Sequence, residues 1–270
     1  MPSPEPLDPM APQAVVLFDI DGVIRDVGGS YRRAIVETVH HYSGAWPEPG
    51  AIDSLKSEGC WNNDWEASLE LLRRSNHSPL PAFEELVEVF GGFYFGGDPD
   101  GDPGQWQGFI GSEPLLVAPA FFEALSQAAM AWGFVSGAEP PSCRYVLETR
   151  LGLSEPPLIA MGQAPDKPNP TGLLQLAARL AGGELGAQAA PVAYLGDTVA
   201  DVLTVQHAKQ ACPEQRFLSL AVAPPHLQTP EASAERAHYE GRLREAGADA
   251  ILPSTQALDP QTLRQLLSAL

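Results

Sequence analysis

Basic residues are scarce in this chain of 270 residues, and lysine is the scarcest of them. Sixteen Lys and Arg residues stand against 34 Asp and Glu residues, which gives a formal net charge of −18. Nucleic acids and anionic membrane surfaces bind basic faces, so we expect neither as a partner. The charge favours solubility and carries no information about the fold.

Cysteines and long apolar runs are also few. The three cysteines, Cys60, Cys143 and Cys212, are far apart and form no CxxC pair, which argues against a zinc or redox framework. We therefore expect a reducing compartment, the cytoplasm. No run approaches about 18 consecutive apolar residues, and the first residues lack the basic and apolar regions of a signal peptide.

Short apolar runs recur along the chain and alternate with segments of helical spacing. The first run, residues 14–18 (AVVLF), is typical of a strand that is buried on both faces of a parallel sheet. Further strands are predicted at residues 131–135, 158–161, 192–195, 217–222 and 250–252, and helices at residues 142–150, 170–180, 199–208 and 231–246. This alternation predicts an α/β fold with a doubly wound, Rossmann-like and mostly parallel sheet.

The connection between the first two predicted strands is too long for one crossover helix. It contains helical patterns at residues 31–42, 65–75 and 81–94 and a loop rich in Gly, Pro and Asp at residues 96–108. Asp64 is the expected N-cap of the second of these helices. We predict a core formed by residues 1–24 and 115–270 and a helical cap, residues 25–114, that is a candidate lid over a site.

The sequence Asp-Ile-Asp-Gly directly follows the first predicted strand. In an extended chain, residues i and i+2 point the same way, so Asp19 and Asp21 face one pocket. Two carboxylates held together bind a divalent cation, or one of them keeps a proton. An Asp in such a pocket can also act as a nucleophile. The alternative is a solvated Asp-Gly turn.

Three further polar clusters follow later strands. Ser136 and Gly137 offer a hydroxyl and an open backbone N–H for a phosphate oxygen, although Ser-Gly is more often a simple turn. Lys167 lies in the stiff segment PDKPNP and is a compact positive charge suited to phosphate, with an exposed surface lysine as the alternative. Asp197 follows a strand, where it can reach a metal, and Asp201 lies one helical turn further on the same face. The alternative is N-capping by Asp197 or Thr198, which can coexist with metal binding.

All four clusters fall at the carboxyl ends of predicted parallel strands. Ligands bind at these ends in open α/β sheets, so we expect the clusters to converge on one pocket. Several carboxylates, one hydroxyl and one ammonium suit a Mg²⁺-assisted reaction on a phosphate group.

In order and rough spacing, these four motifs resemble the haloacid dehalogenase (HAD) superfamily of phosphohydrolases. The motifs stand as DIDG at residues 19–22, Ser-Gly at 136–137, Lys-Pro at 167–168 and GDTVAD at 196–201. The predicted insert looks like the helical cap of subfamily I. The stretches DIDGVIRDVGGSYRR (19–33) and KSEGCWNNDW (56–65) look like an uncharacterised branch of subfamily IA.

The resemblance implies a role for each matching residue. Asp19 would be the nucleophile that becomes an aspartyl-phosphate, and Asp21 the general acid/base, whose main-chain carbonyl would also bind Mg²⁺. Ser136, with Gly137, and Lys167 would hold the phosphoryl oxygens. The metal ligands would be Asp19, Asp21 and Asp197, with Asp201 as support from the next turn.

Family members that act on carbon–halogen bonds lack an acid at the position of Asp21, so the resemblance implies a phosphatase that acts on a small phosphorylated metabolite. A phosphomutase of the β-phosphoglucomutase type is the main alternative, and a non-catalytic binding protein on the same scaffold is a further one.

The predicted cap carries an unusual polar segment, KSEGCWNNDW. A cap loop above the site would place such groups against the leaving group of the substrate. We therefore expect Lys56, Asn62, Asn63 and Asp64 to determine substrate specificity. For Trp65 we favour packing in the cap core, because large aromatic side chains are usually buried.

Overall fold

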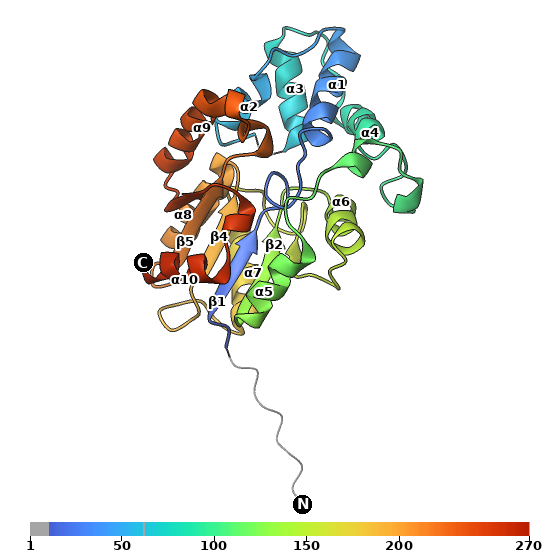
Figure 1. Ribbon diagram of the computed structural model, residues 1–270. Coiled ribbons are helices and arrows are strands. Elements are labelled where there is room, and N and C mark those ends of the chain that lie inside the picture. Colours follow the sequence, from blue (N-terminus) through green and yellow to red (C-terminus); the bar gives the residue numbers. More distant parts are fainter. Residues whose placement is uncertain (1–10, 62, 270) are drawn as a thin grey trace, which may run out of the picture.

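The computed structural model describes residues 11–61 and 63–269. In this part of the chain, six strands form one parallel sheet in the order β3-β2-β1-β4-β5-β6. The strands are β1 (Ala14–Phe18), β2 (Met130–Val135), β3 (Leu158–Ile159), β4 (Val192–Gly196), β5 (Phe217–Val222) and β6 (Ala250–Leu252). Helices cover both faces of the sheet (Figure 1), so the predicted α/β doubly wound fold is confirmed.

Strand β1 lies at the centre of the sheet, and all its residues are buried. Because side chains alternate along a strand, its apolar run serves two cores. Val15 and Leu17 pack towards α7 (Thr171–Ala181) and α8 (Val199–Ala211) on one face. Phe18 packs on the other face, where α5 (Pro119–Gln127) and α10 (Pro260–Ser268) lie. A continuous apolar strand is therefore required here.

The predicted strands agree with the structure except at the edge strand β3. We expected residues 158–161, but β3 ends at Ile159. The next backbone N–H, that of Ala160, donates to the Gln163 side chain at 2.8 Å, so the chain turns away from the sheet. Apolar character alone did not reveal this turn.

The predicted helix at residues 142–150 takes a different form. It begins earlier, as α6 (Pro140–Arg144), with prolines in its first turn, and continues as a π-helical turn over Tyr145–Arg150. Proline is favoured in a first helical turn because backbone N–H groups there have no partner within the helix, so a residue without an N–H loses no hydrogen bond. The helix predicted at residues 231–246 is α9 (Ser233–Glu245). Among the described residues, no helix combines the length and hydrophobicity needed to cross a bilayer.

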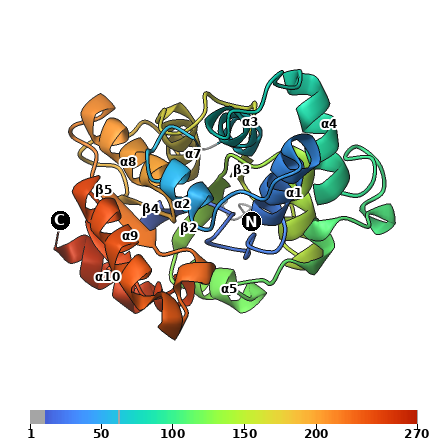
Figure 2. The ribbon, with the colours of Figure 1, turned by 90° about the horizontal axis from the view of Figure 1, so that it is seen from above.

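Four of the helices between β1 and β2 lie together beyond the carboxyl ends of the strands, at the top of Figure 1 and facing the viewer in Figure 2. They are α1 (Tyr31–Ser43), α2 (Ala51–Lys56), α3 (Asp64–Arg74) and α4 (Phe83–Tyr94). Helix α2 was not predicted, because six residues are too few to show a helical period. We keep residues 25–114 as the proposed cap and residues 1–24 with 115–270 as the proposed core.

The N-cap of α3 is Asn63, and the prediction of Asp64 was wrong. The Asn63 side chain accepts hydrogen bonds from the backbone N–H groups of Trp65 and Glu66, at 3.0 and 3.1 Å. Asp64 is the first residue of the helix. Both residue types cap helices well, so the sequence did not distinguish the two neighbouring positions.

The chain leaves and re-enters the proposed core through two paired segments. The Asp26 N–H donates to Pro114 O at 2.9 Å, and the Leu116 N–H donates to Ile24 O at 2.8 Å. Arg25 and Leu115 form an antiparallel bridge between them. We call these segments, residues 24–26 and 114–116, the linker ribbon.

The core between β1, β2 and α5 is aromatic. The ring of Phe134 lies 6.2 Å from that of Phe18 and 5.5 Å from that of Phe122, and all three side chains are almost completely buried. We expect Phe134→Ala to lower the free energy of unfolding by about 3–5 kcal/mol, because it leaves a cavity that these rings cannot fill.

Urea unfolding followed by fluorescence would measure this loss. Leu80→Ala, at a side chain that is 38% exposed, is the control and should change stability by less than about 0.5 kcal/mol. Equal effects of the two substitutions would contradict the proposed packing.

Candidate active site

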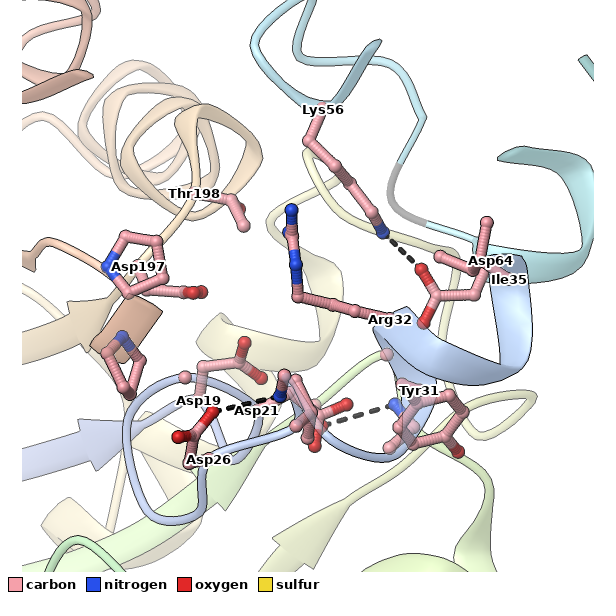
Figure 3. A pocket seen from close by; sticks show the side chains of 18 of the residues that line it. Asp19, Asp21, Asp26, Tyr31, Arg32, Ile35, Lys56, Asp64, Asp197 and Thr198 are labelled. Atoms are coloured by element: carbon pink, nitrogen blue, oxygen red, sulfur yellow. Dashed lines mark hydrogen bonds and ion pairs between the residues drawn. The ribbon is translucent and has the colours of Figure 1, made fainter. Parts of the chain in front are cut away.

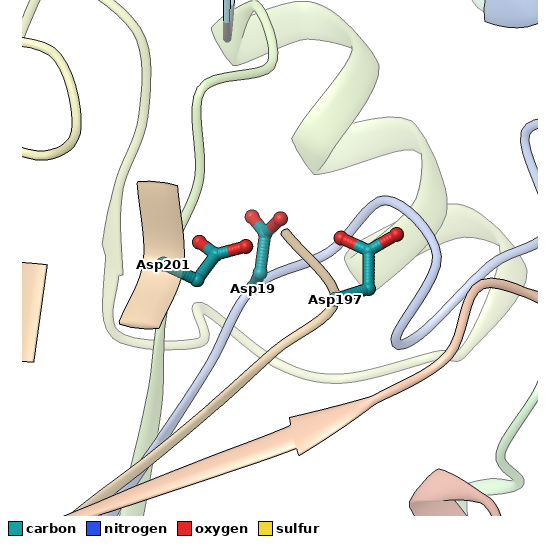
Figure 4. A group of neighbouring side chains, drawn as sticks. All are labelled: Asp19, Asp197 and Asp201. Carbon is teal, nitrogen blue, oxygen red and sulfur yellow. The ribbon is translucent and has the colours of Figure 1, made fainter. Parts of the chain in front are cut away.

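Three acidic side chains meet at the carboxyl ends of the two central strands. Asp19 directly follows β1, Asp197 directly follows β4, and Asp201 lies in the first turn of α8. One carboxylate oxygen from each lies within 4.8 Å of the others, and all three residues are buried. Figure 4 shows the three carboxylates pointing to the same side of the strands, with Asp19 between the other two. The predicted convergence of these residues therefore occurs.

Lys167 brings a positive charge into this cluster. Its Nζ lies 2.5 Å from Asp201 Oδ1 and 3.0 Å from Asp19 Oδ1. It also donates a hydrogen bond to the hydroxyl of Tyr194 at 3.1 Å. The side chain of Lys167 is only 5% exposed, which excludes the alternative of an exposed surface lysine.

Both carboxylate oxygens of Asp201 accept hydrogen bonds. Its Oδ1 accepts from Lys167 and lies 2.9 Å from the Tyr194 hydroxyl. Its Oδ2 accepts from the backbone N–H and the hydroxyl of Thr198, and Thr198 caps α8 in return. Asp201 therefore anchors Lys167 and the start of α8, and it is a poorer candidate ligand than Asp19 or Asp197.

Burial and crowding shift the titration of the cluster. Burial, with Asp201 and Asp21 adding to it and Lys167 opposing it, raises the pKa of Asp19 to about 7. Burial and the neighbouring carboxylates raise the pKa of Asp197 well above its usual range. Burial also acts on Asp201, but Lys167 and Thr198 outweigh it and lower its pKa. The cluster is therefore short of positive charge.

The carboxylate of Asp19 has an incompletely satisfied oxygen. Oδ1 lies within ion-pair distance of Lys167, but the geometry is not that of a hydrogen bond, and this buried atom has no hydrogen-bond partner among the described residues. A buried polar atom without a partner is costly. Hard oxygen ligands, excess negative charge and an unsatisfied oxygen together fit a divalent cation such as Mg²⁺.

A glycine makes room for this arrangement. Gly22 has φ +74°, and a Cβ atom built on it would lie 2.0 Å from Asp197 Oδ2. Any side chain at this position would displace the Asp197 carboxylate, so the Gly of the Asp-Ile-Asp-Gly sequence is required for space as well as for the turn.

Ser136 and Gly137 follow β2 and line the same pocket as Asp19 and Asp197. The Ser136 hydroxyl accepts a hydrogen bond from the Ala138 N–H at 3.2 Å. A hydroxyl that accepts one hydrogen bond can still donate its proton to another group. The placement agrees with the sequence-based expectation, whereas the role of these residues stays a prediction.

Asp21 also lines the pocket, but it does not join the three-carboxylate cluster. Its Oδ1 accepts a hydrogen bond from Arg25 Nε at 2.6 Å. Arg25 is completely buried, and the sequence analysis assigned it no role. A basic residue four positions after Asp21 was the only signal in the sequence, and it does not distinguish a buried partner from an exposed side chain.

The pocket extends from the carboxylates of Asp19, Asp21 and Asp197 up to the proposed cap. Lys56, Asp64 and Trp65 line its upper part. Lys56 and Asp64 form an ion pair there, drawn as a dashed line in Figure 3. Two of the four predicted specificity residues thus lie at the pocket.

The other two predicted specificity residues, Asn62 and Asn63, are not placed at the pocket by the structure. Asn63 is not among the residues that line the pocket, and its side-chain oxygen caps α3. Asn62 lies outside the described residues, so the prediction for it stays a prediction. Helix capping explains the presence of Asn63 without a contact to substrate.

Two polar contacts join the proposed cap to the proposed core. Asp53 in α2 lies 3.1 Å from the ring nitrogen Nε2 of His226 in the proposed core, and 2.9 Å from Nη2 of Arg32 within the proposed cap. Arg242 in α9 donates to the backbone oxygen of Ser57 at 2.6 Å. Arg32 and His226 line the pocket as well. The sequence did not predict the Asp53–His226 and Arg242–Ser57 contacts, because the partners are 173 and 185 residues apart.

Comparison with known proteins agrees with this architecture. The sequence profile of the haloacid dehalogenase-like hydrolases matches residues 14–209. A curated relative, an imidazoleglycerol-phosphate dehydratase of Phytophthora nicotianae, is 30% identical over 198 residues. That match includes 72% of this chain but only 41% of the relative, so the chain spans less than half of that protein's length.

Three solved structures share the fold at low sequence identity. A phosphonoacetaldehyde hydrolase-like protein of Oleispira antarctica has a TM-score of 0.66 at 15% identity and covers 99% of this chain and 97% of its own. The β-phosphoglucomutase of Clostridium difficile has a TM-score of 0.61 at 15% identity, with 95% and 97% covered. Phosphatase Tt82 of Thermococcus thioreducens has a TM-score of 0.58 at 21% identity, with 75% and 91% covered.

The family profile includes the strands that carry Asp19, Ser136 and Asp197 and the loop that carries Lys167. The resemblance noted from the four motifs is thereby confirmed: the chain belongs to the haloacid dehalogenase-like hydrolase family.

Proposed function

We propose that this protein is a Mg²⁺-dependent phosphohydrolase that acts on a small phosphorylated metabolite through an aspartyl-phosphate on Asp19. One observation carries the proposal. Asp19 and Asp197 belong to a buried carboxylate cluster and line a pocket that Asp21 and Ser136 also line, and the Lys167 ammonium lies 3.0 Å from Asp19 Oδ1. A nucleophile, a proton-transfer group and phosphate-binding groups are thus within one site.

In the first step, a carboxylate oxygen of Asp19 attacks phosphorus, and the bond between phosphorus and the leaving oxygen breaks. Asp21 in its protonated form gives its proton to that oxygen, so the alcohol leaves neutral. Lys167 and the Ser136 hydroxyl offset the negative charge that the phosphoryl oxygens carry in the transition state.

In the second step, Asp21 acts as a base. It takes a proton from water, the water oxygen bonds to phosphorus, and the bond between phosphorus and Asp19 breaks. Inorganic phosphate leaves, and Asp19 is again a carboxylate. One alcohol and one phosphate are formed for each ester and water consumed.

Asp19, Asp197 and the main-chain carbonyl of Asp21 would hold Mg²⁺, with Asp201 as support. When bound, the cation neutralises carboxylate and phosphate charge and so permits an anionic ester to approach Asp19. The need for a neutralising cation is strong here, because more carboxylates than basic groups line the pocket.

The pocket favours a small substrate. The proposed cap contributes Lys56, Asp64 and Trp65 to its upper lining, so the site is covered and leaves little room for a polymer. The curated relative is named for a reaction of imidazoleglycerol phosphate, which is itself a phosphate monoester, so this compound belongs in a substrate panel with sugar, polyol and glycolate phosphates.

A phosphomutase is the second candidate, because a β-phosphoglucomutase shares the fold. A mutase returns the phosphoryl group to its substrate and releases little free phosphate. Steady-state phosphate release from members of the panel would favour the hydrolase, and isomerised product without release would favour the mutase. A non-catalytic binding protein would bind phosphorylated ligands and turn over none of them.

We expect Asp19→Asn to lower phosphate release by at least about three orders of magnitude, because an amide oxygen is a poor nucleophile. A malachite green assay on the best substrate would measure this. Asp259→Asn is the matched control and should keep full activity, since Asp259 caps the distant helix α10 and Asn caps equally well. Activity of Asp19→Asn at the wild-type rate would exclude the covalent mechanism.

Metal binding should depend on pH. Burial raises the pKa of Asp19 to about 7 in the folded protein, against 3.8 ordinarily. Between these values the folded protein holds a proton that the unfolded chain has lost. The stability contributed by this proton is therefore lost as the pH rises through about 7. Mg²⁺ replaces the proton, so it should bind more tightly as the pH rises.

Thermal unfolding with and without Mg²⁺ tests this expectation. At a concentration of 100 times Kd, the ion should stabilise the protein by about 2.7 kcal/mol. The same concentration should give a smaller increase in Tm at pH 5 than at pH 8. Asp197→Asn should reduce the increase at both values. An increase in Tm that is independent of pH would contradict proton competition at the carboxylates.

The Lys56–Asp64 pair should affect substrate choice. We expect the double variant Lys56→Met/Asp64→Asn to lower kcat/KM for the best metabolite at least roughly tenfold, because buried polar groups that recognise a substrate discriminate strongly. Hydrolysis of p-nitrophenyl phosphate should change less than about threefold. Lys209→Met/Asp249→Asn, at a half-exposed ion pair elsewhere, is the control. Equal losses on both substrates would argue against a role in specificity.

A further inference from the structure

Arg25 is a charged side chain with no exposed surface. Its Nε donates to Asp21 Oδ1 at 2.6 Å, its Nη1 to Glu113 Oε2 at 2.9 Å, and its Nη2 to Ser142 Oγ at 2.8 Å. Each of its three nitrogens therefore has a different anchor. A buried guanidinium is costly unless it is paired in this way, so the arrangement constrains the side chain to one position.

The Asp21 carboxylate depends on this contact. Its side chain is 25% exposed at the pocket, and within the described part of the chain Arg25 makes the one hydrogen bond that it receives. A short carboxylate at a pocket has several rotamers available. Because the Arg25 guanidinium is fixed at its other two nitrogens, its hydrogen bond to Asp21 favours one of these rotamers.

Glu113 extends the network to the proposed cap. It is 2% exposed and accepts hydrogen bonds from the hydroxyls of Ser30, just before α1, and of Tyr94, at the end of α4. Arg25 and Glu113 lie on or next to opposite strands of the linker ribbon. The contact to Asp21 is thus built where the chain crosses between the proposed core and cap.

We propose that Arg25 is a positioning residue that holds the Asp21 carboxylate in the orientation for proton exchange with the leaving oxygen, and that Glu113 and Ser142 anchor Arg25 for this purpose. The inference rests on the proposed function, in which Asp21 is the general acid/base. Arg25 touches neither the substrate nor the reacting atoms and acts through Asp21 alone.

A positioning role has a consequence that a structural role lacks. A poor leaving group requires a proton from Asp21 as its bond to phosphorus breaks, whereas a stable anion leaves without one. Displacing Asp21 should therefore slow esters with poor leaving groups selectively. The ratio kcat/KM reports this step, because it includes events only up to formation of the aspartyl-phosphate.

The test compares phenyl phosphate with p-nitrophenyl phosphate, whose leaving group is the more stable anion. In Arg25→Lys, the charge is kept, but one ammonium cannot reproduce three separately anchored contacts. We expect kcat/KM for phenyl phosphate to fall at least roughly tenfold and that for p-nitrophenyl phosphate to fall less than about threefold. Ser142→Ala, which removes one anchor and no charge, should give a smaller loss with the same selectivity.

Arg150→Lys is the matched control. Arg150 donates to the backbone oxygen of Glu113 at 2.9 Å and has no contact with Asp21, so its replacement should leave the two rates in their wild-type ratio. Circular dichroism and thermal unfolding establish that each variant is folded. If Arg25→Lys does not fold, Ser142→Ala and Arg25→Met/Glu113→Gln, which removes both buried charges, provide the comparison.

The outcomes separate the two claims. Selective loss on phenyl phosphate in folded variants supports the positioning role. Equal loss on both esters, or none, overturns it and leaves the proposed hydrolase intact. A wild-type protein that hydrolyses neither these esters nor any member of the substrate panel contradicts the proposed function and the positioning role together.

Discussion

Crowding of like charges at the end of the two central strands is the constraint on which the site depends. Three buried carboxylates share the single ammonium of Lys167, and burial makes each unpaired charge costly. The fold meets this cost locally. Tyr194 and Thr198 complete the hydrogen bonds of Asp201, so the shortage of positive charge falls on Asp19 and Asp197. These two carboxylates are the ones that face the pocket.

The parts of the fold that the sequence predicted are those governed by local pattern. Residues 14–18 and 217–222 are strands with the predicted bounds, because a strand buried on both faces must be predominantly apolar. Residues 250–252 also form a strand with the predicted bounds, at the edge of the sheet. Asp19 and Asp197 lie at adjacent strand ends since parallel strands end at one edge of the sheet. Polar clusters that are far apart in the sequence therefore lie close together in the fold.

The features that escaped prediction depend on contacts between distant parts of the chain. Nothing in the sequence near Arg25 indicates that Glu113 and Ser142 will surround it. Asp53 and His226 are separated by 173 residues, so their contact has no local signal. At α3 the failure has another cause, because Asn63 and Asp64 are equally good caps and only backbone geometry selects the first.

The linker ribbon also bears on how such a chain can diversify. The two crossings between the proposed core and cap are neighbours joined by backbone hydrogen bonds at Asp26 and Leu116. An insert whose two ends lie side by side behaves as a surface loop, however many residues it contains, since the entropy of loop closure grows only slowly with length. The helices above the sheet can therefore be exchanged, enlarged or shortened in evolution without any change in strand register beneath them.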